Sequence, residues 1–210
     1  MMRETPADLM RAAKVIPVLT IRRLADAVPL ARALVAGGVR MLEVTLRTAV
    51  GADAARAIRE AVPEAIVGLG TVTTDADLAL AQSLDVPFAF SPGAPDALLA
   101  AAAARGIAFV PGIQTASELM AAIAAGFSTV KFFPAGSAGG IPALNALAGP
   151  FPEALFCPTG GIGEAAIQSW LALPNVVAVG GSWLAPTAEV EAGQWQTITG
   201  RAARIVRALT

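Results

Sequence analysis

The sequence contains no histidine, no tyrosine and a single cysteine. These absences exclude a Ser-His-Asp triad, a Cys-His pair, zinc sites built from Cys and His, and stabilising disulfides. Lysine is nearly absent too, since it occurs only at positions 14 and 131. Any catalysis must therefore use carboxylates, one of two amines, guanidinium groups, hydroxyls or backbone amides.

Charge and long apolar runs are also scarce. Charged residues make up 15% of the 210 residues, and the net charge is −1. Scattered arginines offer nucleic acid no basic patch, so we expect no nucleic-acid partner. Apolar stretches such as Ala97 to Ala104 are too short to span a membrane, and residues 1–7 lack the apolar region of a signal peptide. We therefore expect a cytoplasmic protein with no membrane partner.

The sequence is rich in hydrophobic residues, and strand-like and helix-like segments alternate along it. With 55% hydrophobic residues and no linker-like segment, residues 1–210 are predicted to form one domain. Short apolar runs typical of strands alternate with Ala-rich segments typical of helices, which predicts parallel pairing. The expected strands are Val15 to Leu19, Met41 to Leu46, Ile66 to Leu69, Pro87 to Phe90, Ile107 to Val110, Thr129 to Phe133, Leu155 to Cys157 and Val176 to Val179. Expected helices include Leu24 to Val35, Ala54 to Ala61, Ala76 to Leu84, Ala97 to Ala104 and Ser117 to Ala125.

Eight strand-helix units favour a single-domain (β/α)8 TIM barrel, with a doubly wound open sheet as the alternative. A short helix is expected over Glu4 to Arg11, ahead of the first strand, and a closing helix over Glu189 to Leu209. In TIM barrels the reactive groups come from the C-terminal ends of the strands. We therefore look for chemistry there.

Lys131 is the sharpest single signal, because it lies inside the apolar run Val130-Lys131-Phe132-Phe133. One interpretation is a lysine at a strand edge that extends its amine into solvent. The other is an interior lysine, whose desolvation favours the neutral amine that attacks carbonyls to form a Schiff base. Lys14 precedes the first strand, at the opposite end, and is expected only to face solvent.

Glu43 is the only acid inside an apolar strand run. Strand alternation places Glu43, Thr45 and Arg47 on the inner side. These residues have two interpretations. In the structural one, Glu43 and Arg47 form a buried ion pair. In the functional one, Glu43 transfers protons and Arg47 binds a substrate carboxylate with two hydrogen bonds.

Glycine pairs follow the last two expected strands, and here backbone amides can approach a phosphate. These are Gly160-Gly161 and Gly180-Gly181, the latter followed by Ser182. Several other residues have open or structural interpretations. Thr71 is a ligand or a strand-end cap, Ser91-Pro92-Gly93 a substrate floor or a plain turn, Cys157 an inert packed thiol with no Lys or His beside it in sequence, and Trp170, Trp183 and Trp195 packing residues.

Together these motifs resemble the class I 2-keto-3-deoxy-6-phosphogluconate aldolases, which often also act on 4-hydroxy-2-oxoglutarate. The resemblance covers nearly the whole chain. The stretches that carry it are Ala36 to Arg40, Glu43 to Thr48, Gly70-Thr71-Val72, Ser91-Pro92-Gly93, Pro111-Gly112-Ile113, Lys131 to Ala135, Ala148 to Phe151, Pro158 to Ile162 and Gly180 to Trp183.

The resemblance implies a homotrimeric barrel that needs no metal or organic cofactor. Lys131 would form the imine with pyruvate and Glu43 would relay protons through a water. Arg47 and Thr71 would hold the pyruvoyl carboxylate. The phosphate would be received by Gly160, Gly161, Gly181 and Ser182, and the substrate would be lined by Pro92, Phe133 and Thr159.

The predicted function is therefore a Schiff-base carbon-carbon lyase of the Entner–Doudoroff type, acting on a small phosphorylated keto-deoxy sugar acid. One stretch departs from the family pattern. Family members often carry an acid after the stretch Lys131 to Ala135, where this sequence has Gly136-Ser137, and this difference leaves the fine substrate preference open. The strand-two stretch ending in Arg47 follows the phosphogluconate pattern, since the related phosphogalactonate aldolases usually carry Asn at that position. The alternatives are a metal-dependent pyruvate aldolase and a non-catalytic phosphosugar-binding barrel.

Overall fold

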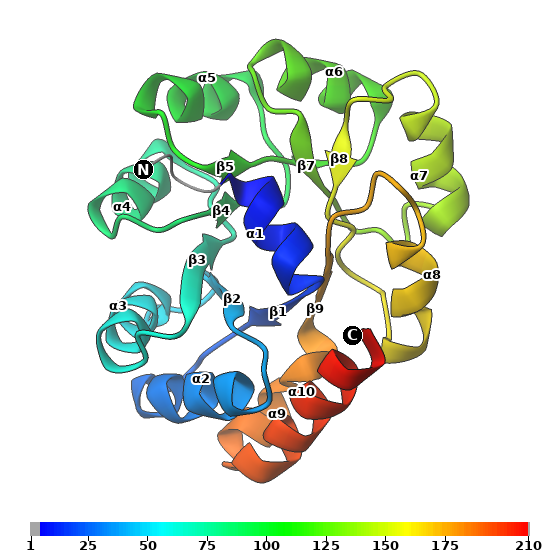
Figure 1. Cartoon of the computed structure of the whole chain (residues 1–210). Coiled ribbons are helices and arrows are strands. Elements are labelled where there is room, and N and C mark those ends of the chain that lie inside the picture. The colour runs from blue at the N-terminus through cyan, green and yellow to red at the C-terminus, as the bar shows by residue number, and fades with distance from the viewer. Residues whose placement is uncertain (1–4, 210) are drawn as a thin grey trace.

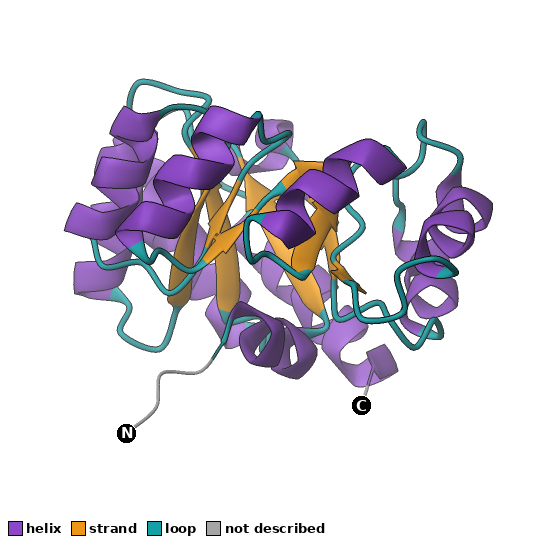
Figure 2. Ribbon diagram, turned by 90° about the horizontal axis from the view of Figure 1, so that it is seen from above, coloured by secondary structure: helices purple, strands orange, loops and turns teal. Residues whose placement is uncertain are grey.

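A computed structural model describes residues 5–209. It has an α/β architecture in which helices surround a curled parallel sheet (Figures 1 and 2). The strands are β1 (Val15–Leu19), β2 (Met41–Thr45), β3 (Ile66–Gly70), β4 (Ala89–Phe90), β5 (Phe109–Val110), β6 (Gly112–Ile113), β7 (Thr129–Phe132), β8 (Leu155–Phe156) and β9 (Val179–Gly181). The α-helices are α1 (Pro6–Ala13), α2 (Ala27–Ala36), α3 (Gly51–Ala61), α4 (Asp75–Ser83), α5 (Asp96–Arg105), α6 (Ala116–Ala124), α7 (Gly140–Ala148), α8 (Ile167–Leu171), α9 (Thr187–Glu191) and α10 (Trp195–Leu209). Three 3₁₀ turns are η1 (Leu24–Asp26), η2 (Glu164–Ala166) and η3 (Ser182–Leu184).

The strands pair in two groups, in the orders β5-β4-β3-β2-β1-β9 and β6-β7-β8, and every pairing is parallel as predicted. The groups meet at Pro111, because β5 pairs with β4 while β6 pairs with β7. At the other side, isolated parallel bridges join Phe156 to Val176 and Thr159 to Gly180. The sheet is thus six strands and three strands, not one continuous set of eight.

Two strand predictions need correction. Pro111-Gly112 was expected to follow the strand Ile107 to Val110. Pro111 does follow β5, but Gly112 already begins β6 and pairs with Lys131. Proline has no N–H for the ladder, yet the Pro111 carbonyl accepts a hydrogen bond from the Lys131 N–H at 2.8 Å, so the chain stays extended. The last strand covers Val179–Gly181 where Val176 to Val179 was expected, so its glycines belong to the strand itself.

The helices begin and end close to residues that favour helix ends. Thr74 and Thr115 are N-caps, and each forms a reciprocal capping box, with Asp77 and Glu118 respectively. The expected closing helix is instead two helices, α9 and α10, because Gly193 lies between them with φ +65°. The N-terminal helix covers Pro6–Ala13, while Glu4, where it was expected to begin, lies outside the described residues. Among residues 5–209, no helix combines the length and apolar character that crossing a bilayer requires.

Two apolar clusters hold the sheet. The outer cluster joins the helices to outward-facing strand residues such as Leu42, Val44 and Phe132. Leu42 and Val44 were expected there, because they alternate with Glu43 and Thr45 along the strand. The inner cluster fills one end of the curled sheet, which α1 covers (Figure 1). Its buried members are Leu9, Met10, Ile16, Met41, Phe88, Phe90, Val110, Cys157, Val177 and Ala178. The opposite end of the same interior is where the polar residues collect.

Candidate active site

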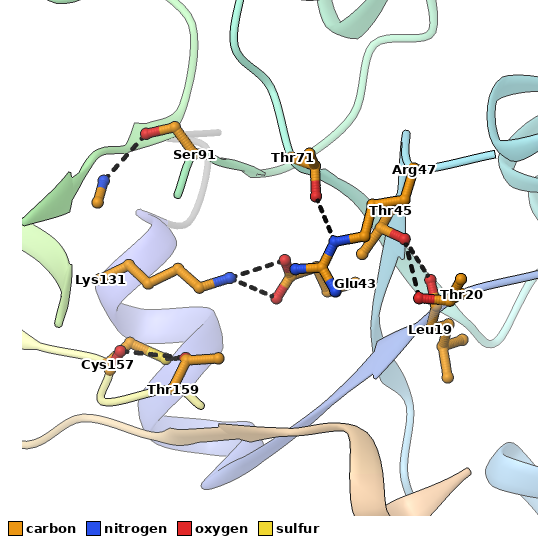
Figure 3. A network of polar contacts seen from close by, with 11 residues as sticks. Leu19, Thr20, Glu43, Thr45, Arg47, Thr71, Ser91, Lys131, Cys157 and Thr159 are labelled. Atoms are coloured by element: carbon orange, nitrogen blue, oxygen red, sulfur yellow. Dashed lines mark hydrogen bonds and ion pairs between the residues drawn. The ribbon is translucent and has the colours of Figure 1, made fainter. Parts of the chain in front are cut away.

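The centre of the polar end is an ion pair between Lys131 on β7 and Glu43 on β2. Lys131 Nζ lies 2.8 Å from Glu43 Oε1 and 3.2 Å from Oε2. The two side chains are 3% and 1% exposed, so the pair is buried. Lys131 is therefore interior, and the interpretation of a solvent-extended lysine is wrong (Figure 3).

The space for this pair is created by small and aromatic neighbours. A Cβ at Gly70 on β3 would collide with the Glu43 carboxylate, so only glycine leaves room for it. Phe90 and Phe133 place their ring centroids 5.0 Å and 5.5 Å from Lys131 Nζ. Aromatic faces at these distances attract a cation and exclude water at the same time. The amine and the carboxylate thus interact with each other in a nearly dry setting.

Arg47 follows β2 and bonds outside this pair. Its Nε donates to Thr71 Oγ1 at 3.1 Å, which leaves its two terminal nitrogens for a ligand (Figure 3). Thr71 has φ +62°, a left-handed conformation that turns its hydroxyl toward Arg47. The predicted alternative of a Glu43–Arg47 ion pair is wrong, because Glu43 pairs with Lys131.

Two more threonines complete the polar interior. Thr45 Oγ1 donates to the Leu19 carbonyl at 2.9 Å, which fixes β1 against β2 beside Glu43. Thr159 is buried and its Oγ1 donates to the Cys157 carbonyl at 3.3 Å. A Cβ at Gly180 would collide with the Thr159 hydroxyl, so this glycine makes room for a side chain as Gly70 does.

A hollow of about 280 Å³ opens at this end of the sheet. Its lining brings together most of the predicted carboxylate, phosphate and substrate residues. They are Arg47, Phe133, Thr159, Gly160, Gly161, Gly181 and Ser182, with Val18, Ile162, Gly163 and Trp183 beside them. Gly160 and Gly161 have φ of +90° and +72°, a backbone conformation that favours glycine and that can present N–H groups to an anion.

Four of the predicted residues do not line this hollow: Lys131, Glu43, Thr71 and Pro92. Pro92 is absent from its lining, and neighbouring Ser91 accepts a hydrogen bond from the Gly112 N–H at 2.9 Å. The Ser91 hydroxyl therefore links the end of β4 to the start of β6. Thr71 accepts a hydrogen bond from Arg47, which does line the hollow. Val18 and Gly163 were not predicted; the alternation of β1, which turns Val18 to the same side as Ile16, could have identified the first.

Cys157 is buried, and desolvation raises the pKa of its thiol to about 12. It was expected to be inert because no lysine adjoins it in sequence. In space, the Lys131 charge does lower its pKa, but burial outweighs this effect. The thiol is therefore inert as predicted, but the reason is its burial and not the absence of a nearby lysine.

The other lysine lies at the opposite end of the sheet, as predicted. Lys14 follows α1 and precedes β1, and its side chain is exposed. Its Nζ donates to the Leu209 carbonyl at the end of α10, so it is bonded to the protein as well as facing solvent. Within residues 5–209, no three His, Cys, Asp or Glu side chains group as potential metal ligands.

Among known protein families, the sequence pattern of the KDPG and KHG aldolases matches residues 7–201. KDPG is 2-keto-3-deoxy-6-phosphogluconate, and KHG is 4-hydroxy-2-oxoglutarate. A 2-dehydro-3-deoxy-phosphogluconate aldolase of Pseudoalteromonas atlantica is 50% identical over 199 residues, covering 95% of this chain and 93% of the relative. The chain belongs to the KDPG and KHG aldolase family. A KHG/KDPG aldolase of Escherichia coli is 50% identical over 192 residues, covering 91% of this chain and 90% of the relative.

Solved structures of this family share the fold. KDPG aldolase from Legionella pneumophila superposes with a TM-score of 0.93 at 42% identity, covering 97% of this chain and 99% of that one. That structure holds pyruvate captured at low pH as a covalent carbinolamine. Members of the family are aldolases, which are carbon-carbon lyases, so the resemblance seen in the sequence motifs is confirmed.

Proposed function

We propose that this aldolase works through an imine at Lys131. The observation that carries the proposal is the buried pair of Lys131 Nζ and the Glu43 carboxylate, 2.8 Å apart at the polar end of the sheet. Lys131 is the only lysine there, since Lys14 lies at the other end. A carboxylate in contact with an ammonium group can accept its proton and release the neutral, nucleophilic amine.

The substrate we propose is 2-keto-3-deoxy-6-phosphogluconate, with 4-hydroxy-2-oxoglutarate as a second one. Relatives carry both names. Arg47 offers two free terminal nitrogens to the carboxylate of the substrate, with Thr71 holding its Nε. The glycine backbone of residues 160–161 and 181, with the Ser182 hydroxyl, would receive the phosphate. Phe133 and Thr159 line the same hollow and would contact the substrate.

The chemistry then runs as follows. The neutral amine adds to the C2 carbonyl to form a carbinolamine, which loses water to give a protonated imine. A base removes the C4 hydroxyl proton, the C3–C4 bond breaks, and its electron pair moves into the iminium nitrogen to leave an enamine and glyceraldehyde 3-phosphate. Protonation at C3 and hydrolysis release pyruvate and the amine. Glu43, through a water, is the group we assign to these proton transfers.

The same proposal extends to the architecture. The sequential order of the strands has no reversal of the doubly wound kind, which supports closure into a single-domain (β/α)8 barrel over residues 1–210. The homotrimer is proposed from the family resemblance, and the cytoplasmic location is proposed from the short apolar runs of the sequence. The enzyme is proposed to need no cofactor, since the amine itself supplies the electron sink.

Borohydride reduction in the presence of pyruvate tests the proposal directly. An imine at Lys131 should be trapped as a stable secondary amine, so activity should be lost and peptide mass mapping should find the added group on Lys131. Arg47→Lys, which keeps the charge but not the planar two-nitrogen geometry, should weaken trapping at a given pyruvate concentration. Labelling at Lys14, or full activity after reduction, would contradict the assignment.

A further inference from the structure

Helix α10 makes a pair of contacts with the hollow's loops that the reaction itself does not require. Arg201 and Arg204 lie one turn apart on this helix, and each grips a carboxylate with two nitrogens. Glu189 and Glu164, their partners, belong to the segments that follow β9 and β8. Those two segments begin with the residues that line the hollow.

The Arg201 contact is the more enclosed of the two. Its Nη2 lies 2.7 Å from Glu189 Oε1 and its Nη1 lies 2.9 Å from Oε2. The same Nη1 also donates to the Leu184 carbonyl at 3.1 Å, at the end of η3. Arg201 and Glu189 are 16% and 23% exposed. Arg201 thus fastens both η3 and α9 to the body of the protein.

The Arg204 contact does the same for the other loop. Its Nε and Nη2 donate to Glu164 Oε1 and Oε2 at 2.8 Å and 2.9 Å. Glu164 begins η2, directly after Gly163 of the hollow. This pair is 56% and 36% exposed, so screening by solvent makes it the weaker of the two.

These loops gain from such support because most of the residues proposed to receive the phosphate are glycines. Gly160 and Gly161 have no Cβ to pack, and Gly181 precedes the short turn that presents Ser182. A ligand that is bound by backbone amides requires those amides to hold their directions before it arrives, because ordering them on binding costs affinity. A planar guanidinium with two bonds fixes direction as well as distance.

We propose that Arg201 is a positioning residue for the anion end of the hollow, acting through Leu184 and Glu189 on the turn that carries Ser182, with Arg204 as a weaker second support. The inference rests on the phosphate assignment made above. It assigns Arg201 no contact with the substrate. Its role is to hold the turn of residues 182–184 in the geometry that receives the phosphate.

The test compares Arg201→Gln with Arg105→Gln. Arg105 makes a similar two-nitrogen contact with Asp75, at 2.7 to 3.0 Å, but between α5 and α4. For each variant we would measure KM and kcat for the phosphorylated substrate and for 4-hydroxy-2-oxoglutarate, and amide hydrogen exchange over residues 180–192. Arg201→Gln should raise KM for the phosphorylated substrate by about tenfold, the equivalent of one hydrogen bond to a charged group. In the same variant, KM for 4-hydroxy-2-oxoglutarate should stay unchanged and amide hydrogen exchange should become faster in the turn of residues 182–184. Arg105→Gln should change neither KM nor the exchange rate in this turn.

The outcomes separate the two claims. If wild type favours the phosphorylated substrate and Arg201→Gln keeps that preference, the positioning role is overturned while the phosphate assignment stands. If the wild type has the same kinetics with both substrates, the phosphate assignment itself is wrong. If Arg201→Gln shows faster hydrogen exchange but no change in KM, Arg201 is only structural and the positioning role is overturned. Should Arg201→Gln fold poorly, Glu189→Gln, which retains one acceptor oxygen for Arg201, should give a smaller KM shift in the same direction. No shift in that variant would also overturn the inference.

Discussion

The two ends of the curled sheet's interior are equally buried but chemically opposite. At the amino end, α1 covers a cluster that includes Met10, Ile16 and Met41, each at most 1% exposed. At the carboxyl end, the equally buried Lys131 and Glu43 form an ion pair. Burying apolar groups stabilises a fold, whereas a buried ion pair often contributes less than apolar residues of the same volume.

The difference indicates a division of labour within one interior. The amino end supplies stability. The carboxyl end retains charges that are costly to bury and that the proposed reaction would use. Barrel enzymes generally separate function and stability in this way. Each prediction below either breaks one end or asks how far its influence reaches.

Replacing the proposed nucleophile should have the largest effect. Lys131→Met should lower kcat/KM by on the order of 10⁴-fold or more, because the imine cannot form. It should also cost about 3–5 kcal/mol of stability if Glu43 stays charged, since the carboxylate loses its partner. The double variant Lys131→Met with Glu43→Gln should recover most of the stability and none of the activity, as measured by urea unfolding. Loss of stability in the double variant would mean that the pair is a structural element.

Removing only the proton acceptor should have the next largest effect. Glu43→Gln keeps the size and one acceptor oxygen, but it cannot take a proton. Exchange of pyruvate methyl protons with D₂O should fall by roughly 10²- to 10⁴-fold, while pyruvate still binds. Undiminished exchange, followed by NMR, would show that Glu43 serves only to balance the charge of Lys131.

Opening a cavity at the amino end should move stability alone. Met10→Ala deletes a fully buried side chain of α1 and should cost about 2–5 kcal/mol in the free energy of unfolding. At a temperature where the variant is folded, kcat should match that of the wild type. A kcat that falls with stability would contradict the separation of the two ends.

Cys157 belongs to the apolar cluster and lies near Lys131 in space, so it reports on the boundary between the ends. Because its pKa is raised to about 12, it should not react with Ellman's reagent at pH 8 until the chain is unfolded. Its folded pKa exceeds the ordinary value of 9.0, so its contribution is complete below pH 9.0 and is lost as the pH rises toward about 12. Cys157→Ala should weaken that alkaline loss; rapid labelling of native wild type would place the thiol in a wet site.

The smallest effect is expected at the other lysine. Lys14→Ala removes an exposed contact with the Leu209 carbonyl, and such a change should shift the free energy of unfolding by less than about 1 kcal/mol. Activity and borohydride labelling should be unchanged. A large loss of activity would connect the amino end to the chemistry and break the comparison.

Much of this organisation is local and could be predicted from the sequence. Apolar runs, Ala-rich segments and strand alternation are short-range signals, and they predicted most elements within a few residues. The same alternation identified Glu43 as inward-facing, and a lone lysine in an apolar run identified Lys131. The errors were also local in origin: Pro111-Gly112 has the composition of a turn, and a single glycine at 193 divides what reads as one amphipathic helix.

What only the tertiary structure decided are the pairings between distant segments. Lys131 and Glu43 are 88 positions apart, and their contact replaces the nearby Glu43–Arg47 pair that spacing alone allowed. Cys157 has no lysine beside it in sequence but is close enough to Lys131 for its pKa to respond. Likewise, nothing in the periodicity of α10 indicates which loops Arg201 and Arg204 hold. The physical reason is that helix and strand periods depend on neighbours along the chain, whereas charge pairing depends on which strands the curled sheet brings face to face.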